Sequence, residues 1–422
     1  MSVEDVLDAP LVDMPTVPAP VDCMPAVLAA GRVAPVVKID YFGGAVWVIC
    51  DMELARTALT DRRLSKDIAL APDWMRIPGD ILGSLPPAKV ARTLLMSDGS
   101  EHTRIRATHA RIFTPRNAAT WALRLAHLTE ELLDQIAMEA AKHGGEVNLV
   151  ERYTDQIPLG FICEMLGLPP QLHVEMKRFT NAIIYSPGQS DRAGAVGGLI
   201  GAIAGWARDP SPLSEGVITG LLDAVDGEEA VTIDEVVTWT LGLVMAGFET
   251  TASLIASALW EALRRPADRR PCSEKSIEAW IEETLRVHPS TPHATWRFAA
   301  EDLDLGGYFI PEGAPVQINI AAANRCPHGE IADSFDPGTP RGHISFGLGR
   351  HFCLGAPLAR LEARTAVNAF LVRFPNTVLS ETTEVGWESG WLTRRISLLP
   401  AVLANADLPR LDRERYELPT DR

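Results

Sequence analysis

One helical pattern constrains the fold of this 422-residue chain more than any other feature. It begins at Thr232–Glu235, where a threonine followed three residues later by a glutamate forms a capping box. The pattern runs unbroken to about Arg265 and is ended by Pro266. At 1.5 Å per residue the helix is roughly 50 Å long, enough to cross a whole domain. We therefore expect the rest of the chain to pack around it.

The remaining segments predict a mainly helical α+β protein with small sheets near both ends. β-rich runs at Val36–Ile39 and Ala45–Ile49 predict a hairpin, and further strands are expected at Phe309–Ile320 and Trp391–Leu403. Helical periodicity dominates between them, as in Met52–Leu59, Glu101–Phe113, Ala118–Lys142 and Asp155–Leu168.

The chain shows no repeat period and no long linker, so we expect a single domain over residues 1–422. Residues 1–34 are punctuated by prolines and are expected to be irregular. The stretch Ala193–Ala207 is uncharged and carries glycines at four-residue spacing, as a membrane dimer face does. Because it is too short to span a bilayer, we expect a soluble helix that packs closely through small residues.

Composition excludes several classes of protein. The chain has 39 Lys and Arg against 55 Asp and Glu, a net charge of −16, so its surface repels nucleic-acid phosphates. We find no apolar run of about 18 residues and no signal-peptide pattern, so we expect no membrane span and no secretion. The six cysteines are scattered without a C-x-x-C pair. This predicts free thiols in a cytoplasmic protein.

The loop Phe346–Gly355 is the segment that carries most chemistry. Its cysteine, Cys353, lies in a glycine-rich stretch directly before a predicted amphipathic helix, Ala356–Phe374. Amide N–H groups and the helix dipole favour negative charge at such a place. We therefore expect the pKa of the Cys353 thiol to be lowered, which gives the thiolate form that binds metals.

Three other interpretations of this loop remain open on the residues alone. Cys353 could be a buried structural thiol. Gly347 and Gly349 could belong to a dinucleotide-binding turn, although no strand–turn–helix unit with a downstream acid is found. His351 and Cys353 could be half of a zinc site, although no second ligand pair has suitable spacing.

The same ten residues resemble the haem-binding loop of the cytochrome P-450 superfamily at every defining position. Ala246–Thr251 resembles the family's oxygen-activation motif, and it falls midway along the long helix. Glu283–Arg286 resembles its Glu-x-x-Arg helix. Glu101–Arg106 is similar to the helix that meets the haem propionates, and Arg297 stands where a further propionate-binding arginine is usual. The resemblance runs from Val36 to Pro400 and implies the P-450 fold.

The resemblance also implies a site. The cofactor is haem b, iron protoporphyrin IX, with Cys353 as the iron ligand. Glu249 and Thr250 are the catalytic pair, in which the hydroxyl stabilises bound oxygen and the acid relays protons. Glu283 and Arg286 are structural. The cofactor-binding residues implied are His102, Arg106, Ala246, Gly247, Arg297, Phe346, Gly347, His351, Cys353 and Gly355.

Residue chemistry agrees with these roles. His102 and Arg106 are four residues apart, so both project from one helical face towards the carboxylates they would bind. Ala246 and Gly247 are small and leave room for oxygen and substrate. For Thr250 an alternative remains, a hydrogen bond back to the carbonyl four residues earlier.

Some positions depart from the usual bacterial pattern of the family. Asp98-Gly99-Ser100 replaces Asp-Pro-Pro, Cys326 replaces a common aspartate, and Arg395 replaces a frequent glycine. Ser334 stands where an arginine usually completes a triad with the Glu-x-x-Arg pair, which puts the third member of the triad in question.

Family position places the substrate pocket around the loop Leu70–Leu95, whose Trp74, Met75 and Ile81 suggest an apolar or aromatic substrate. His293 is a polar candidate for recognition, with a core histidine as the alternative. The pocket candidates elsewhere are Leu243, Val244, Ala246, Thr291, His293, Ala294 and Ile396.

The resemblance therefore implies a haem-thiolate monooxygenase. It uses O2 and two electrons from an external ferredoxin with its reductase, or from a flavodoxin, to hydroxylate a small or medium organic substrate such as a natural-product intermediate. The chain holds no reductase domain before Arg422. A basic patch of Arg111, Arg116, Arg350 and Arg360 could receive the donor, or these could be ordinary solvated arginines. Oxidative coupling or ring closure without oxygen insertion is the alternative reaction, and a non-catalytic haem sensor the alternative class.

Overall fold

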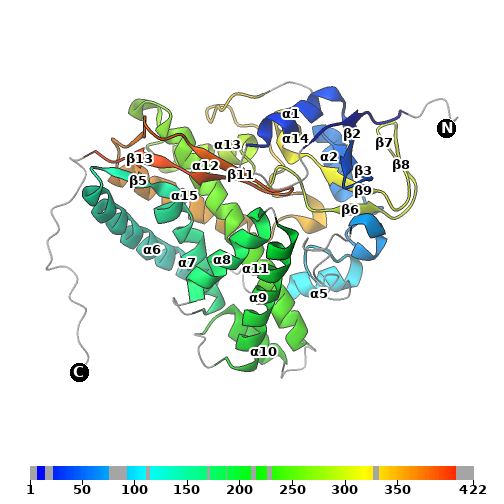
Figure 1. Ribbon diagram of the computed structural model, residues 1–422, viewed down its shortest axis with the longest axis horizontal. Helices are drawn as coiled ribbons and strands as arrows, with labels where there is room; N and C mark the ends of the chain where they lie inside the picture. Colours follow the sequence, from blue (N-terminus) through cyan, green and yellow to red (C-terminus); the bar gives the residue numbers. More distant parts are fainter. Residues whose placement is uncertain are drawn as a thin grey trace.

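The computed structural model describes residues 7–14, 22–75, 93–110, 115–168, 172–186, 188–210, 215–225, 231–326 and 332–404, with the backbone alone at 115–120, 189 and 224. Helices fill most of the molecule, and a small sheet lies at one side with α1, α2 and α14 against it (Figure 1). The α-helices are α1 (Met24–Val33), α2 (Met52–Thr60), α5 (Gly99–Ala110), α6 (Pro115–Lys142), α7 (Gln156–Leu166), α8 (His173–Tyr185), α9 (Gln189–Arg208), α10 (Val217–Val225), α11 (Ile233–Gly247), α12 (Glu249–Leu263), α13 (Glu274–Val287), α14 (Ile320–Arg325) and α15 (Ala356–Arg373).

The largest sheet joins distant parts of the chain. Its order is β1 (Leu11–Val12), β2 (Val36–Tyr41), β3 (Gly44–Ile49), β9 (Pro315–Ile318), β6 (Arg297–Ala299) and β4 (Leu64–Ser65). The predicted hairpin is confirmed as β2–β3, with Val36 opposite Ile49. Phe42 and Gly43 both have positive φ in its turn, the conformation that two-residue hairpin turns require.

Smaller strand groups complete the β structure of the described residues. One group orders β10 (Val378–Leu379), β13 (Pro400–Val402) and β5 (Glu146–Asn148). The two hairpins are β11 (Gly386–Ser389) with β12 (Arg394–Leu398), and β7 (Leu303–Leu305) with β8 (Tyr308–Ile310).

Three predicted segments need correction. The segment 1–34 is not irregular throughout, because residues 24–33 form helix α1. Its proline lies in the first turn, where the missing N–H group costs no hydrogen bond. The strand expected over Phe309–Ile320 is divided between β8 and β9 by a turn with Gly313 at φ 76°, and Ile320 already begins α14. The predicted strand region Trp391–Leu403 is likewise divided, into β12 and β13.

The long central helix is present but not unbroken. It is split at Phe248 into α11 and α12, and its capping box at Thr232 and Glu235 is formed as expected. The Thr250 hydroxyl donates a 2.7 Å hydrogen bond to the Ala246 carbonyl oxygen, and such back-bonding bends helices. By length and composition Ile233–Leu263 could cross a membrane, but 67% of its most apolar window is buried inside the protein. This burial is typical of a core helix.

Helix α9 contains the glycine-rich stretch, and its packing differs from the expectation. A Cβ atom added at Gly197, Gly201 or Gly205 would have no neighbour from another element within 4 Å. These three glycines therefore allow no close approach of a neighbouring helix. A Cβ at Gly198 would instead lie 2.4 Å from the Phe179 ring of α8. The close contact of α9 thus uses a glycine outside the four-residue series.

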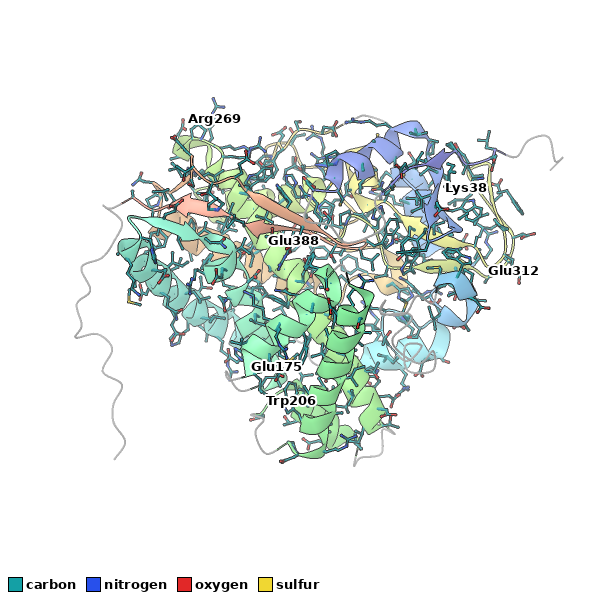
Figure 2. All side chains as sticks on the ribbon, in the orientation of Figure 1. Lys38, Glu175, Trp206, Arg269, Glu312 and Glu388 are labelled. Carbon is teal, nitrogen blue, oxygen red and sulfur yellow. The ribbon has the colours of Figure 1, made fainter. Side chains whose placement is uncertain are left out.

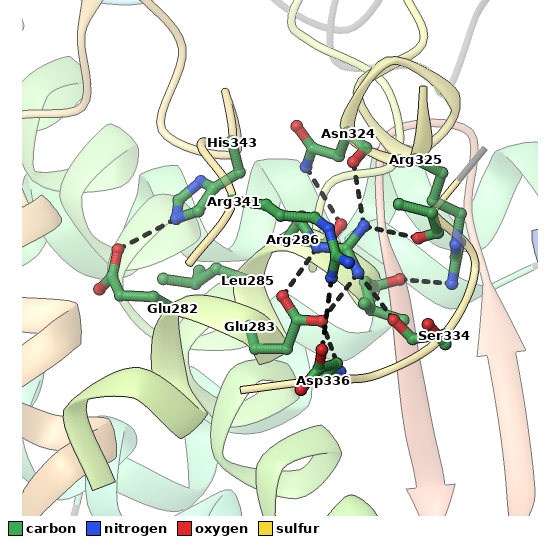
Figure 3. A network of polar contacts seen from close by, with 12 residues as sticks. Glu282, Glu283, Leu285, Arg286, Asn324, Arg325, Ser334, Asp336, Arg341 and His343 are labelled. Atoms are coloured by element: carbon green, nitrogen blue, oxygen red, sulfur yellow. Dashed lines mark hydrogen bonds and ion pairs between the residues drawn. The ribbon is translucent and has the colours of Figure 1, made fainter. Parts of the chain in front are cut away.

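A buried ion-pair network fixes the backbone before the cysteine loop (Figure 3). Arg286 on α13 is fully buried and donates two 2.7 Å hydrogen bonds to the Glu283 carboxylate. Its remaining N–H groups donate to the carbonyl oxygens of Ala332 at 2.7 Å and Ser334 at 2.8 Å. The Asp336 backbone N–H donates to Glu283 at 2.7 Å. The Asp336 N–H group thus gives the Glu283 carboxylate a further donor, while Ser334 stands at the position of the third arginine.

The same network reaches the loop through Asn324. Its side-chain amide donates to the Arg286 carbonyl oxygen at 3.2 Å and to the Ser345 hydroxyl at 2.9 Å, and its oxygen accepts the Ile344 N–H at 2.9 Å. Ser345 in turn donates to the Leu285 carbonyl oxygen at 2.6 Å. The residues directly before Phe346 are therefore held by the core.

Replacing Glu283 by glutamine should lower the free energy of unfolding by about 3–5 kcal/mol, because it leaves the Arg286 charge buried without its counter-ion. Chemical denaturation measures the change. Glu278→Gln on the same helix is the control, since its pair with Arg364 is exposed by 49% and 37%. That change should cost less than about 1 kcal/mol. Equal losses in the two variants would contradict this account of the network.

Candidate functional site

Cys353 is positioned by a tightly turned loop. Its backbone N–H donates to the Phe346 carbonyl oxygen at 2.8 Å, which closes the loop on itself. Gly347 and Gly349 have φ of 69° and 70°, conformations in which other residues are strained. A Cβ at Gly355 would lie 3.9 Å from the Cys353 sulfur, so the sulfur is close to the start of α15. The glycines that the sequence singled out thus shape the loop around the thiol.

The expected lowering of the Cys353 pKa is wrong for the polypeptide itself. Burial raises the pKa, and it outweighs the Gly355 and Ala356 backbone N–H groups and the charges of Arg106 and Arg360, which act in the opposite direction. Yet the residue has exposed surface. The Cys353 thiol is therefore accessible to a ligand, and a metal cation bound there would deprotonate it outright.

Beside the loop, two histidines and one acid meet. His102 on α5 and His351 lie with ring centroids 4.3 Å apart. His351 Nε2 contacts Asp98 Oδ1 at 2.9 Å, and burial holds the pKa of His351 down at about 4. Burial alone would raise the pKa of Asp98, but hydrogen bonds from His351, Ser65 and the Lys66 backbone hold it below its usual range. His102 Nε2 is buried and has no partner.

Two basic side chains, Arg297 and Lys66, lie near the His102–His351–Asp98 cluster. Arg297 on β6 is buried, its Nε has no partner, and burial lowers its pKa to about 10. Lys66 is also buried and donates to the Thr295 carbonyl oxygen at 3.0 Å, and burial lowers its pKa. A cavity of about 380 Å³ lies alongside, lined by His102, Thr103, Arg106, Ala107, Ala110, Gly349 and Arg350.

This arrangement fits a ligand with two carboxylates. Orphaned donors on His102 and Arg297 are costly unless an acceptor satisfies them. The arginines Arg106, Arg297 and Arg350 outnumber the one acid of the cluster, Asp98, so an anionic partner is favoured. Haem carries two propionates, and its iron would take the Cys353 thiolate as ligand. His102, Arg106, Arg297, His351 and Cys353 therefore suit haem.

The two small residues of the central helix, Ala246 and Gly247, have different surroundings. Ala246 is exposed although most of α11 is buried, so it borders open space. A Cβ at Gly247 would lie 3.0 Å from the Ile162 side chain, so this glycine makes room for helix α7. That Gly247 also leaves room for oxygen and substrate stays a prediction. Thr250 takes the back-bonded conformation left open by the sequence, which keeps its oxygen free to accept further hydrogen bonds.

Glu249 begins α12 and is fully buried. Burial raises the pKa of its carboxyl group to about 7, although a hydrogen bond from the Tyr185 hydroxyl acts against the rise. Its second oxygen, Oε2, has no partner. A buried acid that titrates near neutral pH is suited to proton transfer.

The expected substrate pocket is only partly assembled by the described residues. Leu243, Thr291 and Ala294 are partly exposed. Val244 and Ile396, however, are packed in the two largest hydrophobic clusters, so they are core residues and not pocket walls. Sequence position alone cannot separate the two cases, because both kinds of residue are apolar.

His293 is a core histidine, the alternative that the sequence left open. It stacks on Trp391 at 4.7 Å and contacts the Trp391 carbonyl oxygen at 3.2 Å. Met75 is buried and Trp74 packs against the β2–β3 turn at Gly44. Ile81 and residues 76–92 of the proposed pocket loop lie outside the described residues.

The expected basic patch is not formed by the arginines that the structure describes. Arg350 pairs with Asp98 at 3.1 Å. Arg360 donates to both oxygens of Glu282 at 2.6 and 2.9 Å and lies over the Phe346 ring. Arg111 and the side chain of Arg116 lie outside the described residues.

Four contributors to the site were not assigned a role from the sequence: Lys66, Asp98, Tyr185 and Arg395. Tyr185 lies 64 residues before Glu249 and Asp98 lies 253 residues before His351, and no local pattern signals such pairs. Only Arg395 gave a hint, as a departure from the family pattern.

Comparisons with known proteins identify the family of the chain. Residues 275–397 match the family described as Cytochrome P450. The chain is 34% identical to the cytochrome P-450 monooxygenase DoxA of Streptomyces sp. strain C5, over 87% of this chain and 92% of that protein. It is 31% identical to the 6-deoxyerythronolide B hydroxylase of Saccharopolyspora erythraea, over 88% and 93%.

A solved structure gives the same result for the fold. The myxobacterial cytochrome P450 CYP267B1, in complex with myristic acid, superposes with a TM-score of 0.81 at 28% identity and covers 90% of this chain and 96% of that one. The mainly helical α+β fold expected from the sequence is thus confirmed as the P450 fold. The chain belongs to the cytochrome P450 family of haem-thiolate monooxygenases.

Proposed function

We propose that this monooxygenase hydroxylates a small or medium-sized natural-product intermediate in the cytoplasm, with haem b as its cofactor. The observation that carries the proposal is the accessible Cys353 thiol in its glycine-rich loop, close to the buried cationic side chains Lys66 and Arg297. The two relatives described above, a monooxygenase and a hydroxylase, support oxygen insertion. A ferredoxin with its reductase, or a flavodoxin, supplies the electrons.

Each residue of the site has a separate role in this proposal. Cys353 holds the iron, and His102, Arg106, Arg297 and His351 hold the carboxylates. When bound, haem supplies the redox chemistry that activates O2 with two electrons. The Thr250 oxygen accepts a hydrogen bond while its own O–H group donates to the Ala246 carbonyl oxygen. Glu249 delivers protons from its unpartnered Oε2.

Product analysis tests hydroxylation. The holoenzyme is supplied with electrons, ¹⁸O2 and candidate substrates, beginning with 6-deoxyerythronolide B, the molecule named in one relative. Candidates that shift the haem spin state are carried forward. We expect a product heavier by one labelled oxygen atom. A product lighter by two hydrogens without label would replace hydroxylation by coupling or ring closure. Haem binding with no turnover of any spin-shifting ligand would favour a sensor.

Glu249→Gln should lower kcat roughly 100-fold, because it removes a positioned proton donor. In the unmodified enzyme kcat should fall as pH rises through about 7, since the pKa of Glu249 is raised to about 7 and the donor form is the protonated one. The Gln variant should lose this fall. Glu362→Gln, which replaces another buried acid, should keep it. A pH dependence that survives Glu249→Gln would assign proton delivery to another group.

A further inference from the structure

The buried Glu249 carboxyl group is held by a side chain from a different helix. Tyr185, at the C-terminal end of α8, donates its hydroxyl proton to Glu249 Oε1. The Thr393 hydroxyl, from the segment before β12, donates in turn to the Tyr185 oxygen. Thr393 is partly exposed. A row of hydroxyl groups thus leads from accessible surface to one oxygen of the acid, while Oε2 has no partner.

Arg395 fixes this tyrosine. Its guanidinium lies 4.4 Å from the Tyr185 ring centroid. It donates to Glu388 on β11 at 3.0 and 3.1 Å and to the Asn181 side chain of α8 at 3.4 Å. Figure 2 labels Glu388 on this hairpin. The contacts join α8 to the β11–β12 hairpin, and β12 packs against α12, which carries Glu249.

The charges around Glu249 come from several elements. Burial raises the pKa of Glu249, and the acids Asp155 and Glu388 raise it further. The Tyr185 hydrogen bond and the Arg395 charge lower it. Lys177 Nζ on α8 lies 3.0 Å from Asp155 Oδ2, and Arg395 Nη1 lies 3.8 Å from the same oxygen. Removing either Tyr185 or Arg395 should therefore raise the pKa of Glu249.

We propose that Tyr185 and Arg395 are positioning residues for Glu249, and that Tyr185 passes it a new proton each time it gives one up. The proposal rests on the function proposed for Glu249. As the acid loses its proton from Oε2 to water, the Tyr185 O–H proton moves to Oε1. The Thr393 proton then moves to Tyr185, and water reprotonates Thr393. Each O–H bond that breaks is replaced by one that forms, and no electrons are transferred.

Infrared difference titration of the resting holoenzyme tests this without turnover. Comparison with Glu249→Gln assigns the carboxyl band, which should titrate with a midpoint near pH 7. Tyr185→Phe should move the midpoint upward by about one pH unit, because a hydrogen bond to the charged form is lost. Arg395→Gln should also move it upward. Tyr153→Phe, which removes another buried tyrosine hydrogen bond, to the Ala366 carbonyl oxygen, should leave it unchanged.

A second readout concerns the hydroxyl row. Tyr185→Phe should lower kcat about 10-fold at unchanged KM and enlarge the solvent deuterium isotope effect, because reprotonation then limits the rate. An unmoved infrared midpoint in both Tyr185→Phe and Arg395→Gln would overturn the positioning role. An unchanged isotope effect would overturn the proton transfer. Because the titration needs no turnover, a moved midpoint in an enzyme that inserts no oxygen would refute only the proposed function.

Discussion

The buried ion pair between Glu283 and Arg286 is the constraint on which the site depends. A charge at zero exposure is stable only when its donors are all used, and Arg286 uses them on Glu283 and on the backbone carbonyl oxygens of Asn324, Ala332 and Ser334. Those contacts fix the segment that leads into the cysteine loop. The pair is therefore a support for Cys353, although it touches no reacting group.

Electrostatics completes the site in two opposite ways. Near the loop, buried cations outnumber acids, and their orphaned donors favour an anionic ligand. In the central helix, the buried acid Glu249 lacks a full positive partner, so its pKa is raised to about 7. Burial drives both effects, because it penalises every charge that lacks a counter-charge. The cations near the cysteine loop therefore suit a ligand with two negative charges, and Glu249 is suited to exchange a proton.

The sequence predicted the fold class, the hairpin at Val36–Ile49 and the central helix with its capping box, because those features rest on local periodicity and local hydrogen bonds. It did not predict the break at Phe248, near which the Thr250 hydroxyl donates a hydrogen bond back to the Ala246 carbonyl oxygen. It also placed Val244 and Ile396 in a pocket, whereas they belong to the core. Apolar periodicity says that a residue is buried but not what it is buried against.

The carbon monoxide spectrum of the dithionite-reduced protein tests the central claim, that Cys353 provides a thiolate ligand to haem iron. The account predicts the strongly red-shifted Soret band of a thiolate–carbonyl haem. This band should be lost in Cys353→Ser and kept in Cys326→Ser, whose cysteine lies at the end of α14. A Soret band at the position of histidine-ligated haem, or a protein that takes up no haem, would contradict it.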